Sequence, residues 1–199
     1  MSNVSDPSII VAVVIGLLLI SLLWIAYRRY KKSIHCQITT ILRPYIRDEI
    51  KHIIIPDGIG GLIEVEHLVL IDQGLLLIET YPVSGNLFGS DKMNLWSQVI
   101  DGRSYKFANP LPHIYIMRQA LQVLAPGIPI FCRIIFNADS VFPKGKPEEV
   151  SVLKSLENDM LTVRSSAIIL DKSRQAWNQI MRIARKDGKA VQQKGTGND

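Results

Sequence analysis

The sequence predicts an α/β protein in which a mixed β-sheet is flanked by helices and is preceded by one transmembrane helix. Three observations indicate this class. An uncharged apolar run fills residues 9–27, two strand-like segments meet at the tight turn Asp72-Gln73-Gly74, and helix-like segments lie on both sides of the β-branched run 128–136. The part of the chain that follows the apolar run is long enough for one domain with its own core.

The apolar run is 19 residues long, and only Gly16 and Ser21 in it fall outside the hydrophobic set. As a helix it would be roughly 28 Å long at ~1.5 Å per residue, which suits a bilayer core of about 30 Å. The alternative is a helix buried in a protein core. The leader 1–8 carries no Lys or Arg, whereas the basic segment 28–33 carries four. By the positive-inside rule, the sequence predicts a single-pass protein of the bacterial inner membrane, with an extracytoplasmic leader and a cytoplasmic C-terminal domain.

The charge of the chain does not indicate a broad nucleic-acid-binding surface. The chain carries 23 Lys and Arg against 18 Asp and Glu, and four of the basic residues lie in the segment 28–33. Attraction to anionic lipid accounts for those four, so the bilayer itself is an expected partner. The remainder is only weakly basic, and DNA or RNA binding must be argued from a site. Cys36 and Cys132 are too few for a disulfide-rich scaffold, and we expect free thiols.

Residues 34–186 are expected to form the domain, and the Gly- and Gln-rich residues 187–199 a disordered tail. The pattern predicts, in order, a helix over 34–50 with a break at Pro44, strands over 62–71 and 75–81, short strands around Asp101-Gly102, a helix from Asn109 to about Leu124, a buried strand over 128–136, a helix over 147–158, a short strand over 167–170 and an amphipathic helix over 173–186. Proline interrupts a helix, Asn-Pro is a favourable helix start, and β-branched residues favour a buried strand. Glycines and a proline between 82 and 89 break the pattern.

Two glutamates are the candidate chemical groups. Side chains alternate along a strand, so Glu66 shares a face with Leu68, and Glu79 shares a face with Leu77 on the second strand. A carboxylate among apolar neighbours is costly to bury unless it has a partner or a metal. A hairpin that brings the two acids together would supply oxygen ligands for Mg²⁺ or Mn²⁺. The alternative is that both glutamates lie at strand ends and face solvent.

Four segments carry a resemblance to a known family. They are Ile63–Thr80, which reads I-E-V-E-H-L-V-L-I-D-Q-G-L-L-L-I-E-T, Gly85–Gly89, which reads G-N-L-F-G, Trp96–Gln98, which reads W-S-Q, and Asn109–Leu111, which reads N-P-L. In order and spacing they resemble the core of the NERD (nuclease-related) domain. That family reads I-D-H-hydrophobic, a Gly turn, I-E-x-K, G-x-(I/L)-x-G, W and N-P-x-x-Q. The resemblance covers about residues 34–136.

The resemblance implies a restriction-endonuclease-like fold and metal-dependent cleavage of nucleic acid. In such folds a hairpin presents an acidic residue and an E-x-K pair to Mg²⁺ or Mn²⁺, which polarises the scissile phosphate. By the resemblance, Glu66 stands where the family has Asp, and Glu79 stands at the Glu of E-x-K. These two are the implied catalytic and metal-binding residues, with the carbonyl of Thr80 as a further ligand. Tyr81 takes the position of the catalytic lysine.

Several positions depart from the family pattern. Tyr81 brings no positive charge to the phosphate, and Glu66 is one methylene longer than Asp. His113 stands at the family's Gln, and Gln37 is the nearest candidate for the acidic residue of the first helix. The expected result is a degenerate site: a weak or lost nuclease that retains binding to DNA, RNA or a protein partner. The alternatives are rescue by a relocated lysine, Lys92 or Lys106, or a non-catalytic membrane-proximal interaction module.

Overall fold

The computed structural model describes the backbone of residues 7–164, 167–186 and 189–190. The chain divides into two compact units, residues 1–40 and 41–199, and each is described here by itself. The expected leader 1–8 and tail 187–199 therefore lie largely outside the described residues. Cys36 and Cys132 are both free thiols, as expected.

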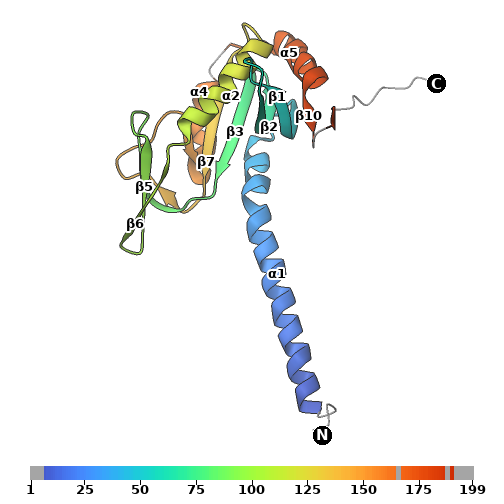
Figure 1. Cartoon of the computed structure of the whole chain (residues 1–199), viewed down its shortest axis with the longest axis vertical. Coiled ribbons are helices and arrows are strands. Elements are labelled where there is room, and N and C mark those ends of the chain that lie inside the picture. The colour runs from blue at the N-terminus through green and yellow to red at the C-terminus, as the bar shows by residue number, and fades with distance from the viewer. Residues whose placement is uncertain (1–6, 165–166, 187–188, 191–199) are drawn as a thin grey trace, which may run out of the picture. The chain divides into compact units, whose positions relative to one another are not determined.

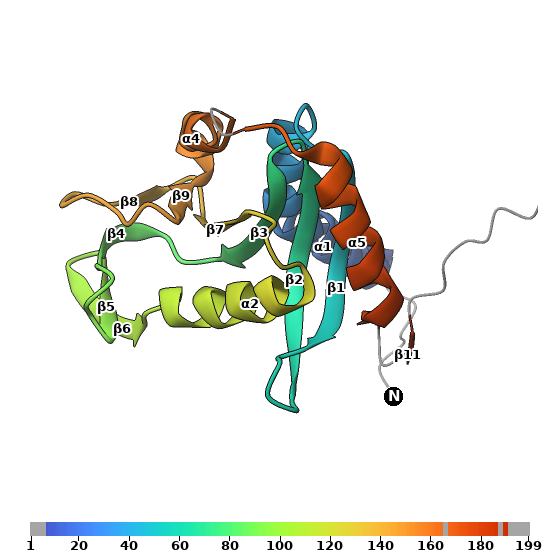
Figure 2. The ribbon, with the colours of Figure 1, turned by 90° about the horizontal axis from the view of Figure 1, so that it is seen from above.

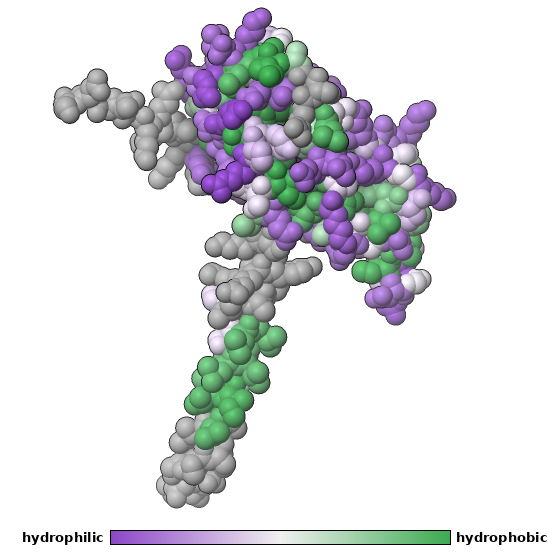
Figure 3. All heavy atoms as spheres, turned by 180° about the vertical axis from the view of Figure 1, so that it is seen from behind, coloured by the Kyte–Doolittle hydropathy of each residue, from purple (hydrophilic) through white to green (hydrophobic). Residues whose placement is uncertain are grey.

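Helix α1 (Pro7–Leu42) makes up the described part of the first unit. The large apolar side chains described between Val11 and Trp24 are all exposed, and Figure 3 colours them as hydrophobic. Among the residues that the structure describes, no helix is both long and apolar enough to cross a membrane. The transmembrane helix predicted over 9–27 is thus not supported. Part of that run lies outside the described side chains.

The second unit is built on two mixed sheets (Figure 1). The larger sheet has the strand order β11-β10-β1-β2-β3-β7-β9. Its strands are β1 (Asp48–Pro56), β2 (Leu62–Ile71), β3 (Gly74–Tyr81), β7 (Ile130–Phe136), β9 (Val150–Val152), β10 (Arg185–Lys186) and β11 (Lys189–Ala190). β1, β2 and β3 are antiparallel neighbours, whereas β7 runs parallel to β3 and β9 parallel to β7. The predicted α/β class with a mixed sheet flanked by helices is confirmed, with two sheets instead of one.

Two helices cover one face of the larger sheet, α2 (Leu111–Leu124) and α5 (Leu170–Ile183), as Figure 2 shows. Their buried side chains join the inward residues of β2 and β3, among them Leu68 and Leu77, in one hydrophobic core. Burial of such aliphatic side chains contributes about 1.5–3 kcal/mol each, so this face fixes how β2, β3 and α2 lie together. The short segments η1 (Leu153–Ser155), α3 (Leu156–Asp159) and α4 (Leu161–Arg164) follow β9.

The smaller sheet has the order β6-β5-β4-β8 and is centred on a buried tryptophan. Its strands are β4 (Gly85–Phe88), β5 (Leu95–Ile100), β6 (Arg103–Ala108) and β8 (Ser140–Val141). Trp96 is fully buried, and its ring lies 6.1 Å from the Phe107 ring and 6.2 Å from the Phe136 ring, centroid to centroid. Gly89 lies directly against the indole, where any side chain would collide with the ring. The aromatic cluster thus joins the smaller sheet to β7.

Several predicted elements are correct. The strand over 62–71 matches β2, the strands flanking Asp101-Gly102 are β5 and β6, and α2 ends at Leu124 as expected. The buried strand over 128–136 is β7, and most of the helix over 173–186 is found in α5. These elements all carry strong local signals.

Other predictions are wrong. The predicted break at Pro44 is found, since α1 ends at Leu42 and a residue before proline, here Arg43, is disfavoured in a helix. The helix does not continue to residue 50, because residues 48–56 form β1. The interrupted segment at 85–88 is strand β4. The helix expected over 147–158 is largely replaced by β9 and η1, since pairing with β7 overrides the local helix signal. No strand is found in the described part of 167–170, where α5 begins.

Candidate functional site

The site begins where the pairing between β2 and β3 ends. The last paired residues toward this end are His67 and Ile78. Beyond them, the carboxylate of Glu66 accepts two hydrogen bonds from Thr80, one from its backbone N–H (2.9 Å) and one from its hydroxyl (2.6 Å). The Glu66 carboxylate thus accepts the backbone N–H of Thr80 in place of a backbone carbonyl, at the point where β2 and β3 separate. Both oxygens of Glu66 are engaged in this contact.

Glu79 lies on the same face and meets a histidine from α2. Its Oε1 lies 2.9 Å from Nδ1 of His113. The Glu79 side chain is 13% exposed, whereas that of His113 is 59% exposed. Burial raises the pKa of Glu79 above its usual range, nearby His113 opposes this rise, and the charge of Glu66 adds to it. The pair is therefore a half-buried carboxylate with an imidazole at its solvent side.

Tyr81, the residue expected at the position of the catalytic lysine, lies within an aromatic cluster. Its ring lies 5.9 Å from that of Phe107 and 5.6 Å from that of Phe136. Aromatic pairs at these separations are favourable, so the ring is held in place by its neighbours. The tyrosine therefore fills the position with an apolar ring and a neutral hydroxyl.

Glu66, Glu79 and Tyr81 line one cavity of about 360 Å³. The lining residues are Glu66, Glu79, Thr80, Tyr81, Ala108, Asn109, Pro110 and His113, and we call this space the acidic cavity. Among the described residues that line it there is no Lys or Arg. The structure thus brings the two predicted acids to one place, next to a tyrosine and a histidine.

Asn109 holds the surroundings of the acidic cavity together. Its Oδ1 accepts the N–H of Leu111 at 2.9 Å, which satisfies a donor at the start of α2. The helix starts later than predicted, at Leu111, and Pro110 and not Asn109 is at its cap. Its amide donates to the carbonyl of Met93 at 2.8 Å, with longer contacts to the carbonyls of Ser90 and Asp91. The loop 90–93 is therefore fixed to the helix that carries His113. This connection was not foreseen from the sequence, because it joins residues 16 to 19 positions apart through a side-chain amide.

A second cavity of about 370 Å³ lies beside this loop and carries lysines. Its lining includes Lys92, Lys144 and Lys146, with Asp91 as the opposing acid, and we call it the lysine cleft. Lys146 is bound to Asp159 at 2.9 Å, whereas Lys144 lies 5.9 Å from the centre of the Phe88 ring. Lys92, one of the two candidate relocated lysines, thus lines this cleft and not the acidic cavity.

The remaining candidates lie elsewhere. Lys106, the other candidate lysine, is exposed on β6 and does not line the acidic cavity either. Gln37 belongs to α1 in the first unit.

The residues of the acidic cavity do not fit a tight divalent-metal site. Carboxylate oxygens suit Mg²⁺ and Mn²⁺, which prefer several oxygen ligands. Both oxygens of Glu66 already accept hydrogen bonds, however, and Glu79 is paired with His113. Across the described part of the chain, no group of three or more His, Cys, Asp or Glu residues is placed to hold a metal ion. Two carboxylates alone offer few ligands.

Comparison with known proteins supports a nuclease-related domain here. Residues 41–137 match the model of the NERD family, the nuclease-related domain. The match runs from the residue before the end of α1 to the residue after β7, so it includes the acidic cavity. Over 65 residues the chain is 29% identical to an uncharacterized protein of Bacillus anthracis, covering 33% of this chain and 31% of that protein. The aligned part thus spans less than a third of that relative. No solved structure matches the chain significantly.

Proposed function

We propose that the second unit contains a nuclease-related domain, residues 41–137, and that this unit binds nucleic acid but cleaves it weakly or not at all. The match to the nuclease-related family supports the first part. The observation that carries the second part is the lining of the acidic cavity, where two carboxylates stand without a Lys or Arg among the described lining residues. Cleavage of a phosphodiester needs positive charge where negative charge develops, and this lining supplies none beyond His113.

Tyr81 supports the same conclusion. Its hydroxyl can donate a hydrogen bond, but it cannot stabilise a phosphate with charge. Its ring lies against Phe107 and Phe136, which leaves an apolar surface where the family pattern has an ammonium group. Binding of Mg²⁺ or Mn²⁺ by Glu66 and Glu79 would be weak, because hydrogen bonds already engage both acids.

The lysine cleft is the surface that we assign to nucleic-acid binding. Lys92 and Lys144 are exposed there, and Lys144 lies beside the Phe88 ring, a combination suited to phosphates and bases of a single strand. Asn109 lines the acidic cavity and binds the loop that carries Lys92. A strand held in the cleft would therefore pass close to the acidic cavity.

We further propose that the chain associates with the bacterial inner membrane, with the second unit in the cytoplasm. The exposed apolar side chains of α1 between Val13 and Trp24 and the four basic residues of 28–33 support this. The test is fractionation of cells that express the full chain. We expect it in the membrane fraction, resistant to alkaline carbonate and released by detergent. Recovery in the supernatant without detergent would overturn the proposed location.

The test of the nuclease-related function uses the full-length protein with plasmid DNA and with single-stranded RNA, each with Mn²⁺. We expect salt-sensitive binding and little or no cleavage. Cleavage that Glu79→Ala abolishes, but that the exposed-site control Glu64→Ala preserves, would instead establish an active nuclease. Gain of cleavage in Tyr81→Lys would show that the missing ammonium group limits the reaction. Absence of both binding and cleavage would refute the proposal and leave a protein-interaction module as the remaining function.

A further inference from the structure

A third cavity, of about 290 Å³, lies at the edge of the larger sheet where β7 extends beyond β9. β7 begins at Ile130, but its first residue paired with β9 is Ile134, opposite Val150. The cavity is lined by Arg118, Ile130, Phe131, Cys132, Arg133, Glu148, Glu149, Thr162 and Val163. We call it the arginine cavity; it shares no lining residue with the acidic cavity or the lysine cleft.

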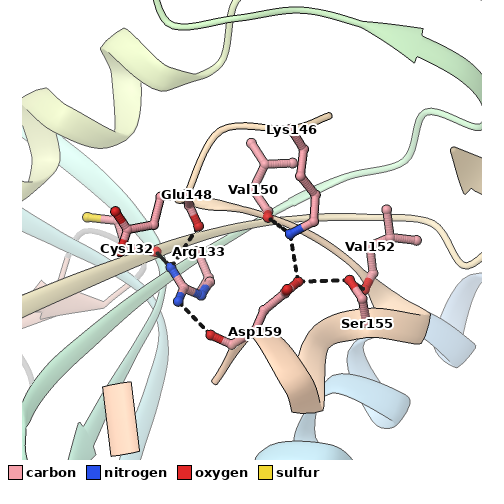
Figure 4. A network of polar contacts seen from close by, with 8 residues as sticks. All are labelled: Cys132, Arg133, Lys146, Glu148, Val150, Val152, Ser155 and Asp159. Atoms are coloured by element: carbon pink, nitrogen blue, oxygen red, sulfur yellow. Dashed lines mark hydrogen bonds and ion pairs between the residues drawn. The ribbon is translucent and has the colours of Figure 1, made fainter. Parts of the chain in front are cut away.

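Arg133 carries a buried charge in this cavity. Only 4% of the residue is exposed. Its guanidinium donates to the backbone carbonyls of Cys132 (3.0 Å), Glu148 (3.1 Å) and Asp159 (2.8 Å), as Figure 4 shows. Its Nε–H has no acceptor among the described residues, and no described carboxylate forms an ion pair with it. A buried charge normally has a partner of opposite charge, and the Arg133 guanidinium has no anionic partner among the described residues.

A second arginine reaches the same cavity from α2. The Nε of Arg118 is also buried without a hydrogen-bond partner among the described residues. Its guanidinium carbon lies 5.0 Å from the centre of the Tyr115 ring, a separation at which a cation–π contact is favourable. Two guanidinium groups, from α2 and β7, thus line one space, and each keeps one N–H donor unused. An unused buried donor is energetically costly, and a ligand acceptor would remove that cost.

Two glutamates, Glu148 and Glu149, also line the arginine cavity, and a third acid, Asp159, contacts Arg133 beside it. Glu149 accepts a hydrogen bond from Tyr115, whose pKa is raised by burial and by this carboxylate. The carboxylate of Asp159 binds Lys146 at 2.9 Å and Ser155 at 2.8 Å, so only its backbone carbonyl faces Arg133 (Figure 4). Glu148 is exposed and reaches Arg133 through its carbonyl alone.

The buried thiol adds no negative charge to the cavity. Burial raises the pKa of Cys132 to about 12, so the thiol stays neutral near pH 7.

We propose that the arginine cavity binds a small oxyanion of the phosphate class. Phosphate oxygens accept hydrogen bonds from guanidinium groups in a geometry that lysine cannot reproduce, and the anion would pair the buried charge of Arg133. The volume has room for a tetrahedral anion with bound water. The source of the phosphate is either the free ion or the terminal phosphate of a nucleotide. The site is independent of the proposed nuclease-related function, because it shares no lining residue with the acidic cavity or the lysine cleft.

The test is calorimetric titration of the detergent-purified full-length chain with inorganic phosphate and, separately, with adenosine monophosphate. Potassium chloride at equal ionic strength is the reference. We expect saturable phosphate binding that Arg118→Gln weakens at least about tenfold, since a charge-assisted hydrogen bond is lost. Arg174→Gln, which removes an exposed arginine of α5, should bind as the wild type does. Tighter binding of the nucleotide than of phosphate identifies a terminal phosphate as the ligand, and equal or weaker binding identifies the free ion.

Two results would overturn the proposal. One is a chloride titration that reproduces the phosphate signal. The other is unchanged phosphate binding in Arg118→Gln. If circular dichroism shows that this variant is unfolded, Arg118→Lys serves in its place, because it keeps the charge and removes the Nε donor. Unchanged binding in Arg118→Lys would refute the role of that donor equally well.

Discussion

Replacing Gly89 by alanine tests the aromatic cluster beside the acidic cavity. An added Cβ would stand well inside 3.0 Å of the Trp96 ring, a separation that real Cβ contacts do not show. Because Trp96 is fully buried against Phe107 and Phe136, the indole cannot move without disturbing its neighbours. Overpacking of this kind costs about 1–3 kcal/mol. Displacement would also weaken the hydrogen bond from Nε1 of Trp96 to the carbonyl of Ser90 (3.2 Å), which adds about 0.5–1.5 kcal/mol.

The expected loss is therefore about 1.5–4.5 kcal/mol of unfolding free energy, or roughly 3–18 °C in Tm for a unit of this size. Urea unfolding followed by tryptophan fluorescence measures it. Gly16→Ala is the matched control, since a Cβ there meets nothing within 4 Å. Nucleic-acid binding should weaken in parallel, because Ser90 leads into the lysine cleft. A Gly89→Ala protein within about 0.5 kcal/mol of the wild type would refute the packing of Trp96 on this glycine.

Two further predictions concern charge. The double variant Lys92→Gln/Lys144→Gln should reduce the slope of log K against log salt for single-stranded RNA binding by roughly 1.4, as expected for two lost phosphate contacts. An unchanged slope, equal to that of the exposed control Lys172→Gln, would exclude the lysine cleft as the binding surface. For Asp159, burial acts to raise the pKa, but hydrogen bonds from Lys146 and a nearby serine outweigh it, so the pKa lies below its ordinary 3.8. The ionised carboxylate therefore stabilises the fold above about pH 4, and this stabilisation is lost as the pH falls through the lowered pKa of Asp159. The variant Asp159→Asn lacks this group, so its unfolding free energy should fall less between pH 7 and pH 3 than that of the wild type. Urea titrations at the two pH values measure the difference.

The elements predicted correctly from the sequence are those marked by a pattern a few residues long, such as alternation, a turn sequence or a helix start. β2, the turn at residue 72 and β3 follow from alternation and a turn sequence, and α2 follows from Asn109-Pro110. β1 and β9 depend on distant partners: Ile53 pairs with Val65, and Val150 with Ile134. The local sequence around 147–152 favours a helix, and only the neighbouring strand makes it extended. Such pairing cannot be inferred from one segment alone.

The acidic cavity, too, could be predicted from the sequence only in part. Strand alternation placed Glu66 and Glu79 each on one face of its own strand, and a paired hairpin was one of two arrangements considered. In the structure both glutamates line one cavity. Their hydrogen-bond partners could not be inferred. His113 comes from a helix 34 residues later, and its distance to Glu79 depends on how α2 packs on β3. Thr80 lies next to Glu79, yet its bonds to Glu66 exist only because the two strands separate at this point.

The separation of the acidic cavity from the lysine cleft limits what this domain can do. A phosphate in the acidic cavity would face the carboxylates of Glu66 and Glu79, so it is repelled unless a cation neutralises them. A phosphate in the lysine cleft meets two exposed ammonium groups, but no carboxylate pair that could hold a metal beside it. Under the proposed function, the positive charge that would attract nucleic acid and the carboxylates that would hold a metal therefore lie in different cavities. Binding can persist without cleavage, and a single ammonium group at position 81 is the smallest change that would bring the two together.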